Sequence, residues 1–163
     1  MKKILKKQSL SLIGTVIVRS YKAGTKKLLK TIVQKNMIMQ ASNVGRDLII
    51  QRLRSVNTYS LNINYGAIGT GSTAVALTDT QLTTETARTT VADSQSSGNN
   101  EAILQFFFAD ATLSNTTYRE FGTFVDGTGT ANSGKIFNHA LFSTPYTKVT
   151  GTDTTVEVSI LLT

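Results

Sequence analysis

Apolar and polar residues alternate along much of this 163-residue chain, and a period of two predicts strands that have one buried face. The first clear run extends from Tyr59 to Tyr65. Later runs follow at 88–92, 102–108, 118–125, 135–147 and 154–162. Segments rich in Gly, Asn, Asp and Ser separate these runs, as turns require. Residues 72–86, rich in Thr and Ala, predict a long surface loop.

The start of the chain predicts a β-hairpin. Residues 10–20 are rich in Leu, Ile and Val, and 28–33 form a second apolar run after turn residues at 22–25. With the later runs this gives seven or eight short strands, which is typical of an antiparallel β-sandwich. We therefore expect a mostly β fold with one sandwich domain over 10–163, preceded by a short basic arm over 1–9.

One segment departs from the period of two. Between Asn36 and Ser55, apolar residues recur at spacings of three and four, which predicts one α-helix near residues 38–55 with a single buried face. Gly45 lies inside this segment and weakens the prediction by about 1 kcal/mol relative to alanine. Asn43 offers an alternative start, as the N-cap of a shorter helix over 44–55.

Composition narrows the chemistry that the chain can perform. Cysteine is absent, which excludes disulfides, thiolate zinc sites, iron–sulfur clusters and cysteine nucleophiles. The chain has one histidine, His139, and no tryptophan. Threonine, which suits a pleated surface, fills 26 positions, of which 23 follow residue 54. We expect no catalytic residue, no cofactor and no metal site, and hence no enzymatic activity.

Charge is divided unevenly along the chain. Residues 1–54 hold 13 Lys and Arg and one acid, giving +12, whereas 55–163 hold four basic and nine acidic residues, giving −5 and a total of +7. This asymmetry favours a basic arm or face that contacts nucleic acid, a lipid surface or the acidic half of another copy, although a solvated face is the simpler alternative. The candidate contacts to another subunit or a polyanion are Lys2, Lys3, Lys6, Lys7, Arg19, Lys22, Lys26 and Lys27.

No membrane partner is expected. The apolar stretch from Leu10 to Val18 is far shorter than the roughly 20 residues that a spanning helix needs. Lys6 and Lys7 precede this stretch and Arg19 follows it at once, which is unlike a signal peptide.

Two motifs that often carry chemistry lack the context they require. Gly129 to Lys135 has the G-x-x-x-x-G-K spacing of a phosphate-binding loop, but Ile136 replaces the usual Ser or Thr and a strand pattern follows instead of a helix. The acids closest to His139 in sequence are Glu120 and Asp126, and strand alternation does not obviously bring them together.

The run Phe106-Phe107-Phe108 places aromatic rings on both faces of one strand. Two interpretations are open. The strand is central and buried on both sides, or one face is covered by a neighbouring subunit, since aromatic residues are enriched at interfaces.

Several stretches carry a resemblance through their order and spacing. They are Asn36 through Gly45-Arg46-Asp47-Leu48, Asn64 to Gly71, the Asp79, Leu82, Glu85 and Arg88 series, Arg119 to Gly122, and Gly134 to Phe142, with Lys148 beyond. Together they are similar to β-modules of bacteriophage virion structural proteins, from the tail, baseplate, neck or head. His139 stands where the pattern has arginine.

The resemblance covers residues 10–163. It implies a non-enzymatic structural role in the virion, in multiple copies. The partners would be other copies of the chain and other virion proteins, with non-specific contact to packaged DNA. Within it, we expect Glu85 and Arg88 to tie down the long loop through charge-assisted hydrogen bonds, and Phe121 to enter the core while Glu120 faces outward.

The alternative function is a host-surface or carbohydrate-binding module of a tail fibre or baseplate. Loops of β folds often bind ligands, and Tyr59, Tyr118 or Tyr146 would then stack on sugars. A third hypothesis is a DNA-contacting protein on the inner side of a capsid or portal, for which the basic residues would bind phosphate.

Overall fold

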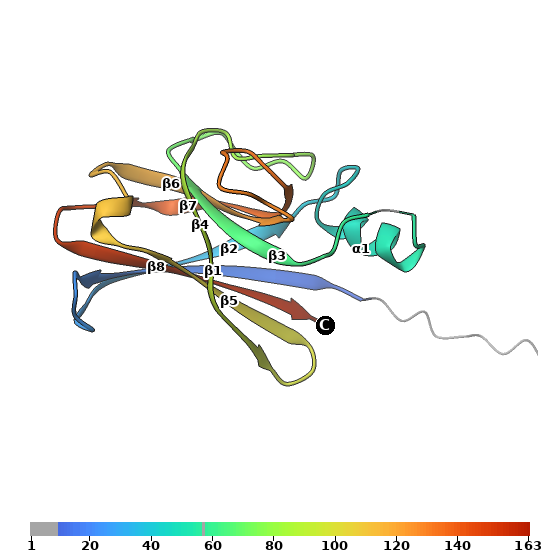
Figure 1. Cartoon of the computed structure of the whole chain (residues 1–163), viewed down its shortest axis with the longest axis horizontal. Helices are drawn as coiled ribbons and strands as arrows, with labels where there is room; N and C mark the ends of the chain where they lie inside the picture. Colours follow the sequence, from blue (N-terminus) through green and yellow to red (C-terminus); the bar gives the residue numbers. More distant parts are fainter. Residues whose placement is uncertain (1–9, 57) are drawn as a thin grey trace, which may run out of the picture.

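In the computed structural model, which describes residues 10–56 and 58–163, eight antiparallel strands close into a barrel (Figure 1). The strand order is β1-β2-β7-β6-β3-β4-β5-β8, and β8 pairs with β1 to complete the ring. The elements are β1 (Leu12–Lys22), β2 (Leu28–Ile38), α1 (Arg46–Leu53), β3 (Ile63–Gly69), β4 (Glu85–Ser97), β5 (Glu101–Phe108), the 3₁₀ turn η1 (Asp110–Thr112), β6 (Thr117–Val125), β7 (Lys135–Thr147) and β8 (Thr152–Leu162).

The chain is mostly β, but the expected β-sandwich is wrong because two strands join what would have been separate sheets. β2 pairs with β1 over 28–36 and with β7 at Met37 and Ile38. β4 pairs with β3 over 85–90 and with β5 over 91–97, and a bulge lies where it changes partner. The alternation of apolar and polar residues along a strand predicts which face is buried but not which strands lie beside it. The sequence pattern therefore fits a β-sandwich and a closed barrel equally.

The main core lies between two walls of the barrel. We call β1, β8 and β5 the first wall, and β7, β6 and β3 the second wall. Alternate residues of the first wall point inward, as the buried Val16 and Val158 illustrate. The rings of Phe106 in the first wall and Phe121 in the second meet across the interior, with centroids 5.6 Å apart. The interior is therefore filled by side chains, as is usual for a barrel of eight strands.

A second, smaller core lies on the outer face of the second wall. The segment 39–45 and the β3–β4 connection, residues 70–84, cover that face. The buried members of this core are Met39, Val44, Ala67, Leu82, Phe124 and Ile136. The segment expected as a surface loop at 72–86 is thus a covering layer, and six consecutive residues of β6, from Glu120 to Val125, are buried as a result.

The helix is shorter than the expected 38–55. α1 begins at Arg46 and ends at Leu53, and Met37 and Ile38 belong to β2. Gly45, with a φ of 48°, stands directly before the helix in a conformation that favours glycine. Asn43 does not cap the helix through its side chain. Its backbone amide instead donates to the Asp47 carboxylate at 2.7 Å.

Close packing at Gly66 gives a test of the barrel core. A Cβ atom at Gly66 would lie 2.6 Å from Phe106 and 2.7 Å from Phe121, both fully buried. We predict that Gly66→Ala lowers the free energy of unfolding by about 1–3 kcal/mol, because the two rings must shift. Gly129→Ala is the matched control, since nothing lies within 4 Å of a Cβ atom there. Denaturant unfolding measures both variants, and equal stability of the two would contradict the packing described.

Candidate functional site

Three ion-pair networks attach loops to the barrel, and the first is built on His139. Glu120 in β6 is 0% exposed and His139 in β7 is 1% exposed. The His139 Nε2 atom lies 3.0 Å from Glu120 Oε2, and Nδ1 lies 2.8 Å from Asp79 Oδ2. This network joins two strands of the second wall to the β3–β4 connection that covers them.

The Glu120 carboxylate holds both ends of that connection. It accepts hydrogen bonds from the backbone amides of Gly71 (3.0 Å), Thr83 (2.9 Å) and Thr84 (2.7 Å). A side chain at Gly71 would collide with the carboxylate, so glycine permits the close approach. With Asp79 bound to His139 in the middle, the beginning, centre and end of the connection are fixed by one network.

The charge of Glu120 is stabilised where it lies. Burial alone would raise its pKa, but the hydrogen bonds from His139 and from the amides of Thr84 and Thr83 outweigh this, and the pKa lies below its ordinary value. Each ring nitrogen of His139 lies within hydrogen-bond distance of a carboxylate oxygen, so both nitrogens take part in the network.

The sequence did not predict this cluster. Alternation places Glu120 on the outer face of β6, as expected, but that face is covered, so the side chain is buried and not exposed. β6 and β7 are paired, which brings Glu120 to His139, and Asp79 comes from a segment 60 residues away in sequence. Within residues 10–56 and 58–163, no group of three or more His, Asp or Glu side chains is placed to hold a metal ion.

The second network is the pair of Glu85 and Arg88. The Arg88 Nε and Nη2 atoms donate to the two Glu85 carboxylate oxygens at 2.6 and 2.8 Å, and both side chains are buried. The guanidinium also lies 4.8 Å from the centre of the Phe124 ring. The pair was expected to hold the loop at 72–86. It holds the β6–β7 connection instead, through Thr128 and Ser133 bound by Arg88, and through the amide of Asn132, which donates to Glu85.

The third network lies at the β7–β8 turn. The buried Lys148 Nζ donates to the Asp110 carboxylate and to the Val149 carbonyl. Asp110 also accepts from the amides of Gly151 (3.0 Å) and Thr152 (3.2 Å). The hydrogen bonds from Lys148 and Gly151 lower the pKa of Asp110 below its ordinary value. This network fixes η1 to the turn.

These networks are part of a wider imbalance between acids and bases. All ten acidic side chains of the chain accept at least one hydrogen bond from another group of the chain. By contrast, the lysines of the β1–β2 hairpin form no ion pair with any described residue. Most acids of 55–163 therefore take part in internal contacts, and the exposed charge is mainly basic, although Asp93 and Asp126 are exposed.

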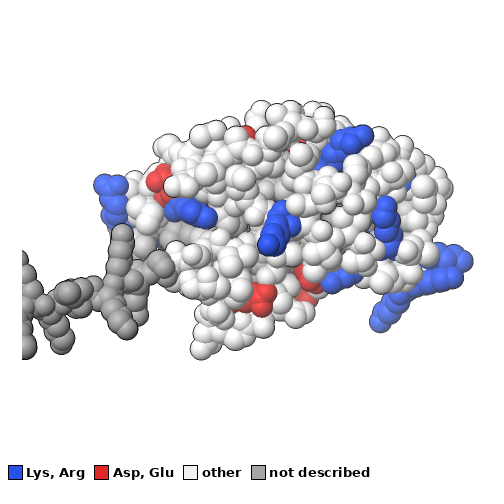
Figure 2. Space-filling model, turned by 180° about the vertical axis from the view of Figure 1, so that it is seen from behind, with Lys and Arg blue, Asp and Glu red and all other residues white. Residues whose placement is uncertain are grey.

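The structure brings together only some of the predicted contact residues. Lys2, Lys3, Lys6 and Lys7 lie outside the described residues. Arg19 is on the outer face of the first wall and pairs with Glu157, with Nη1 and Oε2 3.1 Å apart. The exposed hairpin lysines are Lys22, Lys26 and Lys27, which were predicted, and Lys30 and Lys35, which were not. In Figure 2, basic side chains gather at the end of the molecule that carries this hairpin.

A hollow lies beside the hairpin on the outer face of the first wall. Its volume is about 340 Å³, and its lining residues are Tyr21, Thr25, Lys26, Phe107, Asp153 and Thr155. Phe107 is 46% exposed, whereas Phe106 and Phe108 are fully buried in the core. The strand is thus not buried on both sides by the chain itself, and the second interpretation of the phenylalanine run stays open.

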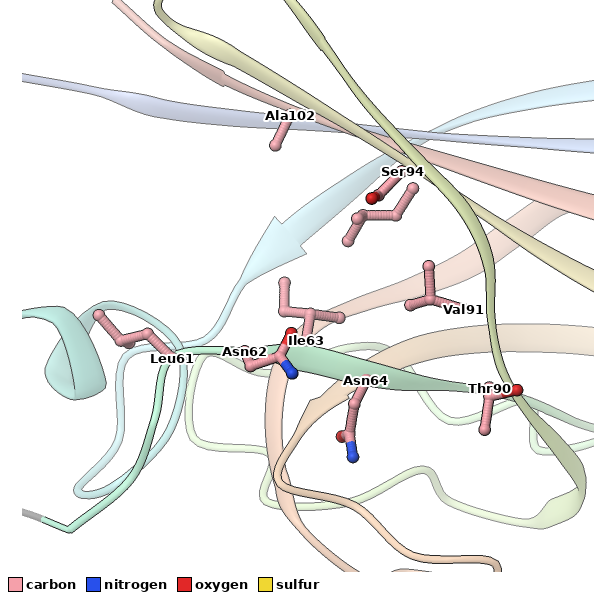
Figure 3. Close-up of a pocket in the computed structure, with 9 residues that line it drawn as sticks. Leu61, Asn62, Ile63, Asn64, Thr90, Val91, Ser94 and Ala102 are labelled. Atoms are coloured by element: carbon pink, nitrogen blue, oxygen red, sulfur yellow. The ribbon is translucent and has the colours of Figure 1, made fainter.

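A larger hollow, of about 510 Å³, opens where β4 leaves β3 for β5 (Figure 3). Apolar side chains such as Leu61, Ile63 and Val91 line it together with Asn62 and polar groups of β4. These apolar residues also pack against the main core. The hollow is therefore a gap in the barrel wall that results from the change of partner in β4.

Two of the three tyrosines proposed to stack on sugars are buried in the core. Tyr118 and Tyr146 are buried and stack on one another, with ring centroids 6.3 Å apart. Burial raises the pKa of Tyr118. Tyr59 is half-buried, and the Lys135 ammonium lies 5.3 Å from its ring centre. Lys135 begins β7, so the segment with phosphate-loop spacing leads into a strand, as the sequence predicted.

No protein-family model matches the chain, and neither a curated protein nor a solved structure matches it. Among the described residues, no helix has the length and apolar character needed to cross a membrane.

The Glu120 network gives a pH-dependent prediction. Glu120→Gln is expected to lower the free energy of unfolding at neutral pH by about 3–5 kcal/mol, because the buried His139 loses its partner charge and three backbone amides lose a charged acceptor. Since the pKa of Glu120 is depressed in the folded state, its contribution is complete above the ordinary carboxyl pKa and is lost as pH falls through the folded pKa. The difference from wild type should therefore shrink below roughly pH 4.

Denaturant unfolding across a pH series measures this difference. Glu101→Gln is the control, because Glu101 lies beside the β4–β5 turn, accepts a hydrogen bond from Ser159 but forms no ion pair with a described residue, and is expected to contribute little. A difference between Glu120→Gln and wild type that stays constant with pH would contradict the role assigned to the carboxylate.

Proposed function

We propose that this protein is a non-enzymatic structural component of a bacteriophage particle, assembled in multiple copies through its basic N-terminal arm and the outer surface of its barrel. One observation carries the proposal. Five of the residues that carry the phage resemblance, Asp79, Glu85, Arg88, Glu120 and Lys148, form part of the three networks, together with His139, which stands where the pattern has arginine. The spacing of these residues thus has a common physical reason, which supports the resemblance as a whole.

The networks suit a subunit that must present the same surface in every copy. A buried ion pair with its remaining hydrogen bonds complete has one low-energy arrangement, because any displacement leaves a charge without a partner in a medium of low dielectric. The β3–β4 and β6–β7 connections and the β7–β8 turn are each held in this way. Their outer surfaces are therefore fixed in shape before any contact forms.

The apolar side chains of α1 offer a surface for contact between copies. Ile50, Leu53 and Val56 are spaced by three residues and exposed, and Leu53 is 78% exposed. Arg52 and Arg54 lie between them and are exposed as well. Exposed apolar groups of this kind are typical of surfaces that become buried on assembly. Contact of this surface with a different surface of the next copy would build a ring or shell.

The proposal is tested directly by the content of the particle. Particles purified from the phage that encodes this chain are expected to contain it in several copies, which quantitative mass spectrometry determines against the major capsid protein as a standard. Intact, infectious particles that lack the chain would overturn the proposal.

Assembly of the purified protein gives a second test. Sedimentation velocity over a wide concentration range is expected to show discrete oligomers, and Leu53→Asp should shift them toward monomer because it places a charge in the contact. Leu77→Asp is the control, since Leu77 is an exposed apolar residue of the β3–β4 connection and does not belong to α1. Equal assembly of Leu53→Asp and Leu77→Asp would exclude α1 as the contact surface.

A further inference from the structure

The two walls of the barrel differ in what lies outside them. The outer face of the second wall is covered by the segments 39–45 and 70–84. On the first wall, the outward residues of β1, β8 and β5 remain at least partly exposed. This uncovered sheet face carries the hollow beside the β1–β2 hairpin, so the features around the hollow are open to a ligand.

Aromatic and polar groups are arranged around the hollow by strand register. Tyr21 of β1 lies opposite Asp153 of β8, and Phe107 of β5 lies opposite Thr155 of the same strand. The two aromatic rings therefore come from strands on either side of β8, and β8 lies between them with a carboxylate and a hydroxyl group. Alternation along β5 turns Phe107 outward while Phe106 and Phe108 enter the core, and it leaves this large apolar ring 46% exposed.

Positive charge surrounds one end of this arrangement. Seven consecutive residues, 24–30, are exposed, and Lys26, Lys27 and Lys30 are among them, with Lys22 on the opposite side of the turn. The one acid in the hollow, Asp153, is held by backbone amides. Its Oδ2 atom accepts from Gly24 and its Oδ1 atom from Asp110, each at 2.9 Å. These amides offset part of the negative charge that Asp153 brings to the hollow.

We propose that this surface binds single-stranded nucleic acid, with a base in the hollow between Tyr21 and Phe107 and the flanking phosphates on the hairpin lysines. Proteins that bind single strands combine aromatic rings, on which bases stack, with a basic surface that follows the backbone. A base also carries N–H groups, such as the N3–H of thymine, that the free lone pairs of Asp153 accept. Bases in a duplex are stacked on each other, so a duplex engages the lysines alone.

This inference goes beyond the proposed function and does not depend on it. A virion protein without a nucleic-acid site would fit the proposed function and not this inference. A nucleic-acid-binding protein outside any virion would fit this inference and not the proposed function. The exposed Leu28 and Leu29 beside the lysines would also suit an anionic membrane surface, but a lipid headgroup makes no use of a hollow flanked by two aromatic rings. We therefore commit to the single strand and keep the membrane as an outcome of the test.

The experiment measures binding of the full chain to a fluorescent oligothymidylate by anisotropy, with an unlabelled duplex of equal length, heparin and phosphatidylserine vesicles as competitors. We expect the single strand to bind more tightly than the duplex, with an affinity that falls as salt is added. Phe107→Leu keeps an apolar side chain but removes the ring, and it should weaken single-strand binding by about 5- to 100-fold. Tyr21→Leu should act in the same direction.

Two controls separate stacking from charge and from misfolding. Val149→Ala alters another exposed apolar residue and should leave binding unchanged, and a thermal melt of each variant verifies that the barrel is folded. Lys26→Glu with Lys27→Glu should weaken single strand and duplex alike, whereas Arg52→Glu with Arg54→Glu on α1 should have a smaller effect. The proposal is overturned if Phe107→Leu and Tyr21→Leu bind the oligothymidylate as tightly as wild type does, or if no binding is found. It is also overturned if the duplex or heparin competes for the protein as well as unlabelled single strand does, or if only the vesicles are bound.

Discussion

A carboxylate buried beneath a loop is the constraint on which this molecule depends. Glu120 accepts hydrogen bonds from three backbone amides of the β3–β4 connection and faces His139, which in turn faces Asp79. A charge at such a depth is tolerated only when its partners are complete. The connection therefore closes over the second wall in one arrangement, and the smaller core of Leu82 and Phe124 forms beneath it.

The same principle organises the rest of the surface. Glu85 with Arg88 and Asp110 with Lys148 fix two further connections, so the acids of the chain act inside the molecule. The hairpin lysines have no such partners among the described residues, and the net charge of +7 is expressed at the surface. One wall is covered and rigid, and the other presents an open sheet with a basic hairpin. This difference between the walls is the basis for the proposed nucleic-acid site.

The sequence predicted those strands whose limits are set by local turn chemistry. The run at 135–147 matches β7, and 102–108 matches β5 to within one residue. β3 was misplaced because Gly66 to Gly69 continue the strand, where glycine admits the Phe106 and Glu120 side chains, and do not end it. β4 extends to Ser97 through polar residues whose strand character comes from pairing with β5 and not from burial. The closure of the barrel was not predicted, because the alternation of apolar and polar residues along a strand does not depend on which strands it pairs with.

For the site, too, local features were predicted from the sequence and contacts between distant segments were not. Glu85 and Arg88 were expected to form charge-assisted hydrogen bonds from their place at the end of the long loop, but the connection that they hold is β6–β7. The cluster of Asp79, Glu120 and His139 joins segments far apart in sequence, and Glu120 seemed exposed because the layer that buries it is a loop. The hollow between Tyr21 and Phe107 likewise needs the register of three strands, which no local pattern contains.

The central claim is that one network locks the β3–β4 connection onto the barrel, and amide hydrogen exchange of Gly71, Thr83 and Thr84 tests it most directly. At neutral pH these amides should exchange as slowly as those of β6. In His139→Gln they should exchange much faster, while the amides of β1 and β8 keep their rates. If the three amides of the wild-type protein exchange as fast as those of the exposed turn at 98–100, the connection is not locked and the account is wrong.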